Sequence, residues 1–250
     1  KVIYNYYKIN IYFKVITFIK KYNYMKYDRI DSELFVKNRK NFMKKMKGKS
    51  IAFFNSNDIY PISADSTLAF EQHRDIFYLS GVDQEESILV LCPNAKDDRH
   101  KEMLFLKETN EHIAVWEGPK LTKQQAYETS GVRTVYWLKD SDKIIAELVD
   151  QCDTLYYNHN EHYRAKVETE TREERFNKWL KEKYPHKKAE RSNPILQRLR
   201  SIKDPTEIDL IQKACDITNK GFRRILNFVK PGVWEYEIEA EFIHEFLNNR

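Results

Sequence analysis

The longest amphipathic pattern of the chain lies near its end, in residues 204–229. Asp204 suits the N-cap of a helix, Pro205 suits the first helical position, and Glu207 completes a capping box. Apolar residues then recur at steps of three, four and seven, at Ile208, Ile211, Cys215, Phe222, Ile225 and Val229. The pattern predicts one long helix with a single apolar stripe.

A second helix is predicted from about Glu235 onward. Residues 230–232, Lys-Pro-Gly, separate it from the first, because proline cannot continue a helix and glycine tolerates the turn. Its inner face carries Ile238, Phe242 and Phe246. Two amphipathic helices leave apolar side chains that need a partner, and we expect this face to drive association when it is uncovered.

Residues 31–183 alternate between amphipathic stretches and short apolar runs. Helices are predicted at 31–47, 121–129, 140–149 and 168–183, and strands at 50–54, 76–79, 87–92, 102–106, 133–137 and 154–157. The strand at 87–92 is apolar on both faces and should be central, whereas residues 55–73 read as a polar connection. Strands that alternate with helices indicate a mixed α/β layer fold.

A polar, proline-containing stretch at 184–188, followed by Asn193-Pro194, marks a domain boundary and the start of a connecting helix. We therefore expect a first domain at 25–188 and the start of a second at 189–250. Residues 1–24 are set apart by composition, because Lys, Ile, Tyr, Asn and Phe fill 21 of the 24 positions. We interpret them as a non-native or disordered tail that precedes a true start at Met25.

The alternative for this tail is a signal or membrane anchor. Lysines at positions 8, 14, 20 and 21 interrupt every apolar run well short of the roughly 18–20 residues that a membrane span needs. A small-residue cleavage site is also missing. The sequence therefore favours a protein without a membrane partner.

The net charge of +5 comes from this tail. Its five lysines account for the excess, because residues 25–250 hold 38 basic and 38 acidic side chains. The charge therefore gives no argument for a nucleic-acid partner or an anionic membrane. Three cysteines, Cys92, Cys152 and Cys215, without a Cys-x-x-Cys pair, indicate buried, reduced thiols and a cytoplasmic protein.

Few residues form a pattern that carries chemistry. Glu241 and His244 have the Glu-x-x-His spacing of dinuclear bundles, but a second such motif is missing. His159 and His162 are expected to be solvated loop residues rather than ligands. Arg74 and Asp75 are expected to make structural ion pairs. The sequence has no Gly-x-Ser-x-Gly elbow and no phosphate-binding loop, so we assign no catalytic and no metal-ligating residue.

Trp116 is the one candidate for ligand binding. It lies in a predicted loop with Gly118 and Pro119, between a strand and a helix. Packing beneath that loop would explain it as well as binding would. A flat apolar ring also suits a proline ring or a peptide side chain, at little cost in rotamer entropy.

Several of these stretches resemble the Xaa-Pro aminopeptidases (aminopeptidase P). Three stretches resemble the opening of the catalytic "pita-bread" domain: residues 199–214, which begin Leu-Arg-Ser-Ile-Lys-Asp-Pro-Thr-Glu-Ile, residues 230–241, and residues 244–246. Residues 74–81, 88–91 and 116–121 resemble the N-terminal domain. The likeness covers residues 25–250. It implies a mixed-sheet α/β N-terminal domain of the creatinase/aminopeptidase P type, followed by a truncated α+β pita-bread domain.

The resemblance also implies an activity. The family uses two divalent ions, usually manganese, to release the N-terminal residue of peptides with proline in second position. Its two Asp, one His and two Glu ligands would lie beyond residue 250, so this stretch alone should be inactive. The family forms homo-oligomers, dimers or tetramers, in which the matching tryptophan, here Trp116, lines the substrate pocket of a neighbouring subunit. Pro119 and Lys120 stand where the family commonly has arginines, so the ion pairs there should differ.

Three other readings remain open. One is a non-catalytic binding or scaffold protein of the same fold, as among histone-chaperone relatives. Another is a prolidase or a creatinase-type hydrolase, and a third is a free-standing domain that regulates through hetero-association. Residues 74–81 and Trp116 favour the aminopeptidase over the other hydrolases.

Overall fold

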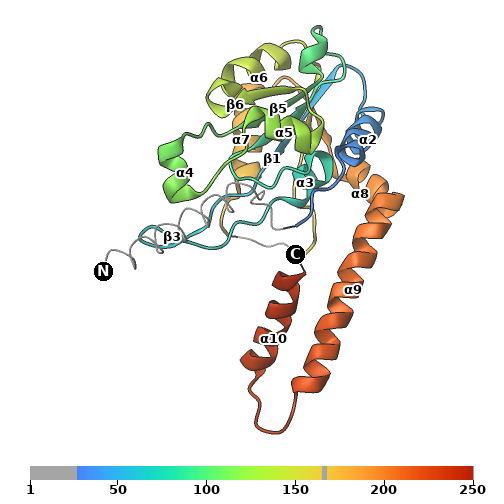
Figure 1. Ribbon diagram of the computed structural model, residues 1–250. Helices are drawn as coiled ribbons and strands as arrows, with labels where there is room; N and C mark the ends of the chain where they lie inside the picture. The colour runs from blue at the N-terminus through green and yellow to red at the C-terminus, as the bar shows by residue number, and fades with distance from the viewer. Residues whose placement is uncertain (1–26, 165–167, 250) are drawn as a thin grey trace. The chain divides into compact units, whose positions relative to one another are not determined.

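The computed structural model describes residues 27–164 and 168–249 (Figure 1). These form two compact units, one of residues 30–212 and one that includes residues 213–249. The tail at 1–24 lies outside the described residues. The predicted domain limits, 25–188 and 189–250, stay predictions.

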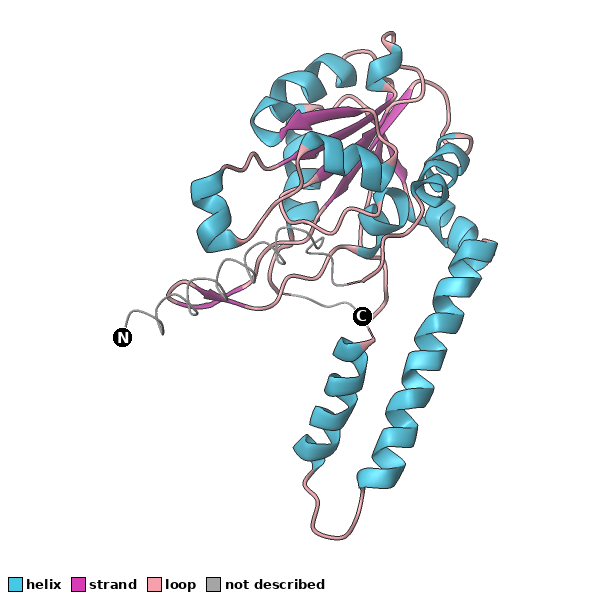
Figure 2. Cartoon of the chain, in the orientation of Figure 1, coloured by secondary structure: helices cyan, strands magenta, loops and turns pink. Residues whose placement is uncertain are grey.

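The first unit is built on a mixed six-stranded sheet (Figure 2). Its strands are β1 (Ser50–Asn55), β4 (Ile88–Leu91), β5 (Glu102–Leu106), β6 (Thr134–Trp137), β7 (Thr154–Tyr157) and β8 (Lys188–Arg191), in the order β6-β5-β4-β1-β7-β8. The pairs β1–β4 and β4–β5 are antiparallel, and the other three are parallel. Every residue of β1 and β4 is buried, which confirms the predicted central strand and the mixed α/β class.

Helices cover both faces of this sheet (Figure 1). One layer contains α2 (Ser32–Met43), α3 (Arg74–Ser80), α5 (Lys123–Ser130) and α8 (Asn193–Ser201); the other contains α6 (Ser141–Val149) and α7 (Arg172–Lys183). Side chains of a strand alternate between faces. Ala52 and Phe54 of β1 therefore join the first core, whereas Ile51 and Phe53 join the second.

Several shorter elements complete the unit: the hairpin β2 (Pro61–Ser63) and β3 (Ser66–Thr67), helix α4 (Glu111–Glu117), and the 3-10 turns η1 (Asp98–His100) and η2 (Leu138–Asp140). The hairpin lies within the stretch predicted as a polar connection. Ile62 and Leu68 are exposed on it. None of the described helices is long and apolar enough to span a membrane.

Helix α3 corrects the prediction of a strand at 76–79. His73 caps it, with Nδ1 accepting from the backbone N–H of Asp75 at 3.3 Å, and Gly81 ends it at a φ of 66°. A four-residue apolar run does not distinguish a strand from a buried helical turn. Strand β8, in contrast, was not predicted at all. Its sequence, Lys-Ala-Glu-Arg, has no apolar run that would indicate an edge strand.

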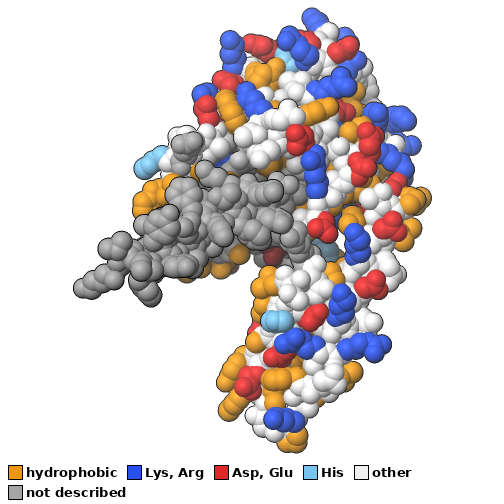
Figure 3. Space-filling model, viewed as in Figure 1, with side chains coloured by type: hydrophobic (Ala, Val, Ile, Leu, Met, Phe, Trp, Pro, Cys, Tyr) orange, Lys and Arg blue, Asp and Glu red, His pale blue; other side chains and the backbone are white. Residues whose placement is uncertain are grey.

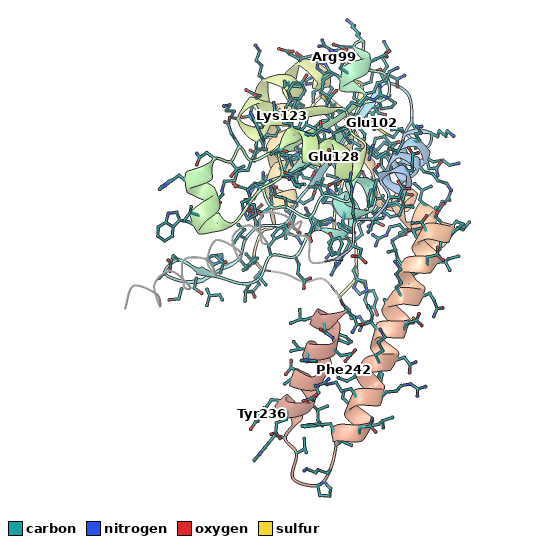
Figure 4. The ribbon with its side chains drawn as sticks, viewed as in Figure 1. Arg99, Glu102, Lys123, Glu128, Tyr236 and Phe242 are labelled. Atoms are coloured by element: carbon teal, nitrogen blue, oxygen red, sulfur yellow. The ribbon has the colours of Figure 1, made fainter. Side chains whose placement is uncertain are left out.

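Helices α3 and α5 end in the same way, with the sequence Ser-Gly-Val. The hydroxyl of Ser80 donates to Ile76 O at 2.7 Å and accepts from the backbone N–H of Val82 at 3.2 Å. Ser130 makes the matching bonds at the end of α5, at 2.7 and 3.0 Å. Figure 4 shows the second helix end near the labelled Glu128, with Glu102 of β5 in the same region.

We expect Gly81→Ala to lower the free energy of unfolding by about 2 kcal/mol or more. Gly81 has φ +66°, and a Cβ atom there would lie 2.3 Å from the Phe35 ring of α2. Gly48→Ala is the matched control, since Gly48 has φ +56° and open space around it, so only the backbone cost of about 1 kcal/mol applies. Urea unfolding of both variants measures the difference; equal losses would contradict the packing argument.

Helices α9 (Pro205–Phe228) and α10 (Glu235–Asn248) confirm the predicted pair. Asp204 caps α9 as expected: its carboxylate accepts from the backbone N–H of Thr206 at 3.0 Å, and its own N–H donates to Glu207 at 2.8 Å. Between the two helices, the ring of Phe242, labelled in Figure 4, meets Phe222 edge to face at 5.1 Å.

Much of the apolar surface of this helix pair is exposed. Phe222, Leu226, Trp234, Phe246 and Leu247 are each more than two-fifths exposed, and hydrophobic side chains are visible on this segment in Figure 3. Cys215 lies on the stripe of α9 and is exposed, so the prediction of three buried thiols is wrong for this one. The reason is that the stripe itself is exposed: Ile208 and Ile211 are 55% and 48% accessible.

Candidate functional site

Trp116 lies in the last turn of α4, between β5 and α5. Its side chain is 81% exposed, and that of the neighbouring Val115 is 76% exposed. The prediction that Trp116 lies in a loop is therefore wrong, and so is the alternative that it packs beneath one. The seven residues of α4 are too few to show a helical period in the sequence. The helix presents a large aromatic surface to solvent.

An ion-pair network fixes the C-terminal end of α4. Glu117, the residue after Trp116, lies 3.2 Å from the Nζ of Lys107 and 3.8 Å from that of Lys120. Lys107 also lies 2.9 Å from Glu86, and this hydrogen bond raises the pKa of Lys107. The exposed helix is thereby attached to the end of β5 and to the segment that precedes β4.

The nearly buried part of this network is the pair Lys120–Glu85. Both side chains are less than a tenth exposed, so solvent screens their attraction far less than at the surface. The next backbone N–H, that of Leu121, donates to Gln84 Oε1 at 2.7 Å. Lys120, where the family pattern commonly has an arginine, thus anchors the loop that follows Trp116.

Arg74 and Asp75 make structural ion pairs, as expected: Arg74 with a residue three positions away and Asp75 with a distant one. Arg74 pairs with Glu71 at 3.2 Å on the surface. Asp75 accepts from Arg200 of α8 at 2.8 Å and from Asn158 Nδ2 at 3.1 Å. Asp75 therefore connects the start of α3 to the end of β7 and to α8.

The remaining candidates, three histidines and Glu241, do not come together in a common site. His159, expected to be solvated, is half-buried: its ring stacks on Tyr157 at 6.3 Å, and burial lowers its pKa. His162 is exposed against Tyr163. Glu241 forms an ion pair with Arg224, while His244 is exposed on α10. Among residues 27–164 and 168–249, no three His, Cys, Asp or Glu side chains come together as a metal site would require.

Sequence reasoning missed Glu173, which is buried in the first turn of α7. Its carboxyl accepts from the backbone N–H of Asn55 at 2.8 Å, and burial raises its pKa to about 8. The adjacent Glu174 makes an ordinary capping box with Thr171. Two neighbouring glutamates in one helical turn look alike in sequence, so only the packing distinguishes them.

Comparison with known proteins places this fold. Residues 35–156 match the family model for the aminopeptidase P N-terminal domain. The Xaa-Pro aminopeptidase of Escherichia coli K12 is 26% identical over 87% of this chain and 49% of its own length. A solved structure of a Bacillus anthracis protein assigned as aminopeptidase P has a TM-score of 0.78 at 25% identity, covering 88% of this chain and 52% of that one.

A zinc-substituted E. coli aminopeptidase P in complex with product also matches, with a TM-score of 0.71 at 24% identity, over 88% of this chain and 50% of that one. The chain spans about half the length of these relatives. Its matched part is their N-terminal region, with the mixed sheet and the helices described above. We conclude that this chain is related to the Xaa-Pro aminopeptidases and that its residues 35–156 are an aminopeptidase P N-terminal domain.

Proposed function

We propose that the complete protein is an Xaa-Pro aminopeptidase, which removes the N-terminal residue of peptides with proline in second position. The match of residues 35–156 to the aminopeptidase P N-terminal domain carries this proposal. A dedicated enzyme suits this bond, because the proline nitrogen has no N–H and its ring restricts the backbone. Residues 189–250 would begin the catalytic pita-bread domain.

The metal of such an enzyme would be held elsewhere in the protein. The described residues contain no cluster that fits a dinuclear manganese site. The family resemblance, rather than this absence, puts the metal ligands beyond residue 250 in our proposal, and on that basis we expect the 250-residue chain to have no peptidase activity when manganese is added. A cytoplasmic homo-oligomer, a dimer or tetramer, completes the proposal.

Trp116 would contribute to substrate binding in a neighbouring subunit. Three observations support this role. The ring is exposed, its helix α4 connects β5 to α5 along the chain, and ion pairs fix the end of the helix. An exposed indole has a flat apolar face, which fits the ring of a proline residue. The network of Lys107, Glu117 and Lys120 would hold that face in place without contacting substrate.

In the complete protein, Trp116→Ala should lower kcat/KM for an Xaa-Pro peptide about tenfold to a hundredfold, because a buried aromatic contact with substrate is lost. Val115→Ala is the matched control: it removes a similarly exposed side chain from the same helix and should leave kcat/KM within about twofold. Steady-state kinetics at fixed manganese measures both. Folding is checked by the thermal midpoint, which neither change should move by more than about 2 °C.

Two results would count against the proposal in different ways. Unchanged kinetics for Trp116→Ala would remove the tryptophan from the substrate site but leave the enzyme assignment intact. Failure of the complete, unsubstituted protein to hydrolyse Xaa-Pro peptides with either manganese or zinc would contradict the enzyme assignment itself. A non-catalytic binding protein of the same fold would then replace it.

A further inference from the structure

Two buried thiols face each other in the core beneath α6 and α7. Cys92 directly follows β4, and Cys152 lies between α6 and β7. Their side chains are 0% and 2% exposed, and the two Sγ atoms are 3.6 Å apart. The sulfurs are therefore in direct contact, although sixty residues separate them along the chain.

The backbone on both sides is fixed by hydrogen bonds. The N–H of Cys92 donates to Lys101 O at 2.9 Å, and its carbonyl accepts from Ala95 at 3.0 Å. The N–H of Cys152 donates to Val149 O at 3.1 Å, in the turn that ends α6. A disulfide needs an S–S distance of about 2.05 Å, so the sulfurs must approach by roughly 1.5 Å. Rotation about the Cα–Cβ bonds of the two cysteines moves the sulfurs while leaving the hydrogen-bonded backbone in place.

We propose that Cys92 and Cys152 are a modification site, at which a peroxide oxidises the two thiols to an intramolecular disulfide that links the end of β4 to the start of β7. The bond would cross the central strand β1, which lies between these two strands in the sheet. It goes beyond the aminopeptidase assignment and does not depend on it.

The ammonium group of Lys187, which lies beside Cys152, favours Cys152 as the thiol that reacts first. The pKa of Cys152 is lowered, because the Cys92 S–H can donate to its thiolate and because the ammonium group of Lys187 lies nearby. Lys187 is held there, since its Nζ donates to Cys152 O at 2.7 Å. Cys92 has the opposite shift: the bond to Cys152 and burial raise its pKa. The contact between the sulfurs and the cation beside Cys152 thus favour Cys152 as the nucleophile and the Cys92 thiol as the proton donor.

The reaction balances with hydrogen peroxide as the only oxidant. The Cys152 thiolate attacks one peroxide oxygen, the O–O bond breaks, and a sulfenic acid and hydroxide result. The hydroxide takes up the proton that the Cys152 thiol released when it ionised and becomes the first water. The sulfur of Cys92 then attacks the sulfenic sulfur, the S–O bond breaks, and the Cys92 proton leaves with that oxygen as water. Two thiols lose two electrons, and one peroxide becomes two water molecules.

Access to the pair comes through the turn that contains Cys152. Asp150 and Asp153 on either side of it are exposed, so one turn of chain separates the sulfur from solvent. Turns at helix ends open locally at a lower free energy than the sheet does. A molecule as small as peroxide can therefore reach Cys152 without global unfolding.

The test uses the full 250-residue chain with Cys215→Ser, which removes the exposed thiol and so prevents links between molecules. After peroxide treatment and proteolysis without reductant, mass spectrometry should find the Cys92 and Cys152 peptides joined with the loss of two hydrogen atoms. The thermal midpoint should rise by about 5 °C or more, because the bond closes a loop of sixty residues, and dithiothreitol should reverse this rise.

Cys92→Ser in the same background is the matched control, and peroxide should leave its thermal midpoint unchanged. In the unsubstituted chain, oxidation of the exposed Cys215 shows that the peroxide dose is sufficient to oxidise an accessible thiol. The proposal is overturned if Cys92 and Cys152 remain free thiols at a dose that oxidises Cys215. It is equally overturned if Cys152 is found as a sulfinic acid while Cys92 stays unmodified.

Discussion

Arg39→Met is expected to lower the free energy of unfolding by about 3 kcal/mol or more. The side chain of Arg39 is fully buried and joins three elements to α2. Its Nε donates to Glu102 at 2.8 Å, and its Nη1 donates to the carbonyls of Leu79 and Ser130, each at 2.8 Å. Methionine fills a similar volume but satisfies none of these acceptors.

The position of those carbonyls explains why a cation is needed. Leu79 and Ser130 lie at the C-terminal ends of α3 and α5, where unpaired carbonyls create partial negative charge. The guanidinium of Arg39 donates hydrogen bonds to the carbonyls at both helix ends and forms an ion pair with the carboxylate of Glu102. Its burial lowers its pKa, and Glu102 opposes that shift, so the charge is retained.

Arg74→Met is the matched control for this prediction. Arg74 and its partner Glu71 are both more than 70% exposed, and such surface pairs contribute less than about 1 kcal/mol. Urea unfolding of both variants gives the comparison. If Arg39→Met unfolded within about 1 kcal/mol of the unsubstituted chain, the three hydrogen bonds would not have the proposed weight.

The second large effect is a loss of stability with rising pH, caused by Glu173. The folded chain raises the pKa of this carboxyl from 4.5 to about 8, because it is buried. Below pH 4.5 both the folded and the unfolded chain hold the proton. Between these values the unfolded chain releases it and the folded chain keeps it. The free energy of unfolding therefore falls as the pH rises, by up to about 5 kcal/mol in total.

Glu173→Gln should remove this dependence. The amide oxygen can still accept from the Asn55 N–H, and the group has no charge to desolvate. Glu174→Gln is the matched control, because Glu174 is exposed on the same turn and glutamine preserves its capping box. Urea unfolding at pH 5 and pH 8 compares the three chains. Identical pH slopes for Glu173→Gln and the unsubstituted chain would show that Glu173 does not carry the effect.

The sequence pattern predicted the elements in which apolar residues form a continuous run or recur at regular spacing. Strands β1, β4, β5, β6 and β7, and the capped helix α9, all followed from runs or stripes of apolar residues. Helix α3 was misassigned because four apolar residues fit either structure. Strand β8 was missed because polar residues dominate it, and helix α4 because seven residues are too few to show a helical period. Tertiary partners fix the positions of both elements.

The candidate site shows the same division. Trp116 could be singled out from its residue type and its neighbours. Its exposure and its position in a helix could not be predicted. Arg39 and Glu173 are single charged residues in charged helices, and nothing in sequence marks them as buried. Their environments come from segments distant in the chain: residue 102 for Arg39 and residue 55 for Glu173. Such pairings exist only once the fold has formed.

The place of β1 in the sheet also has a consequence for synthesis on the ribosome. This wholly buried strand pairs on one side with β4, about forty residues later, and on the other with β7, about one hundred residues later. Translation adds roughly 5–20 residues each second, so β1 waits several seconds for its second neighbour. During that interval the backbone N–H and C=O groups on one edge of β1 have no strand to pair with. The nascent domain therefore closes its sheet late, and one edge of β1 stays unpaired until β7 has been synthesised.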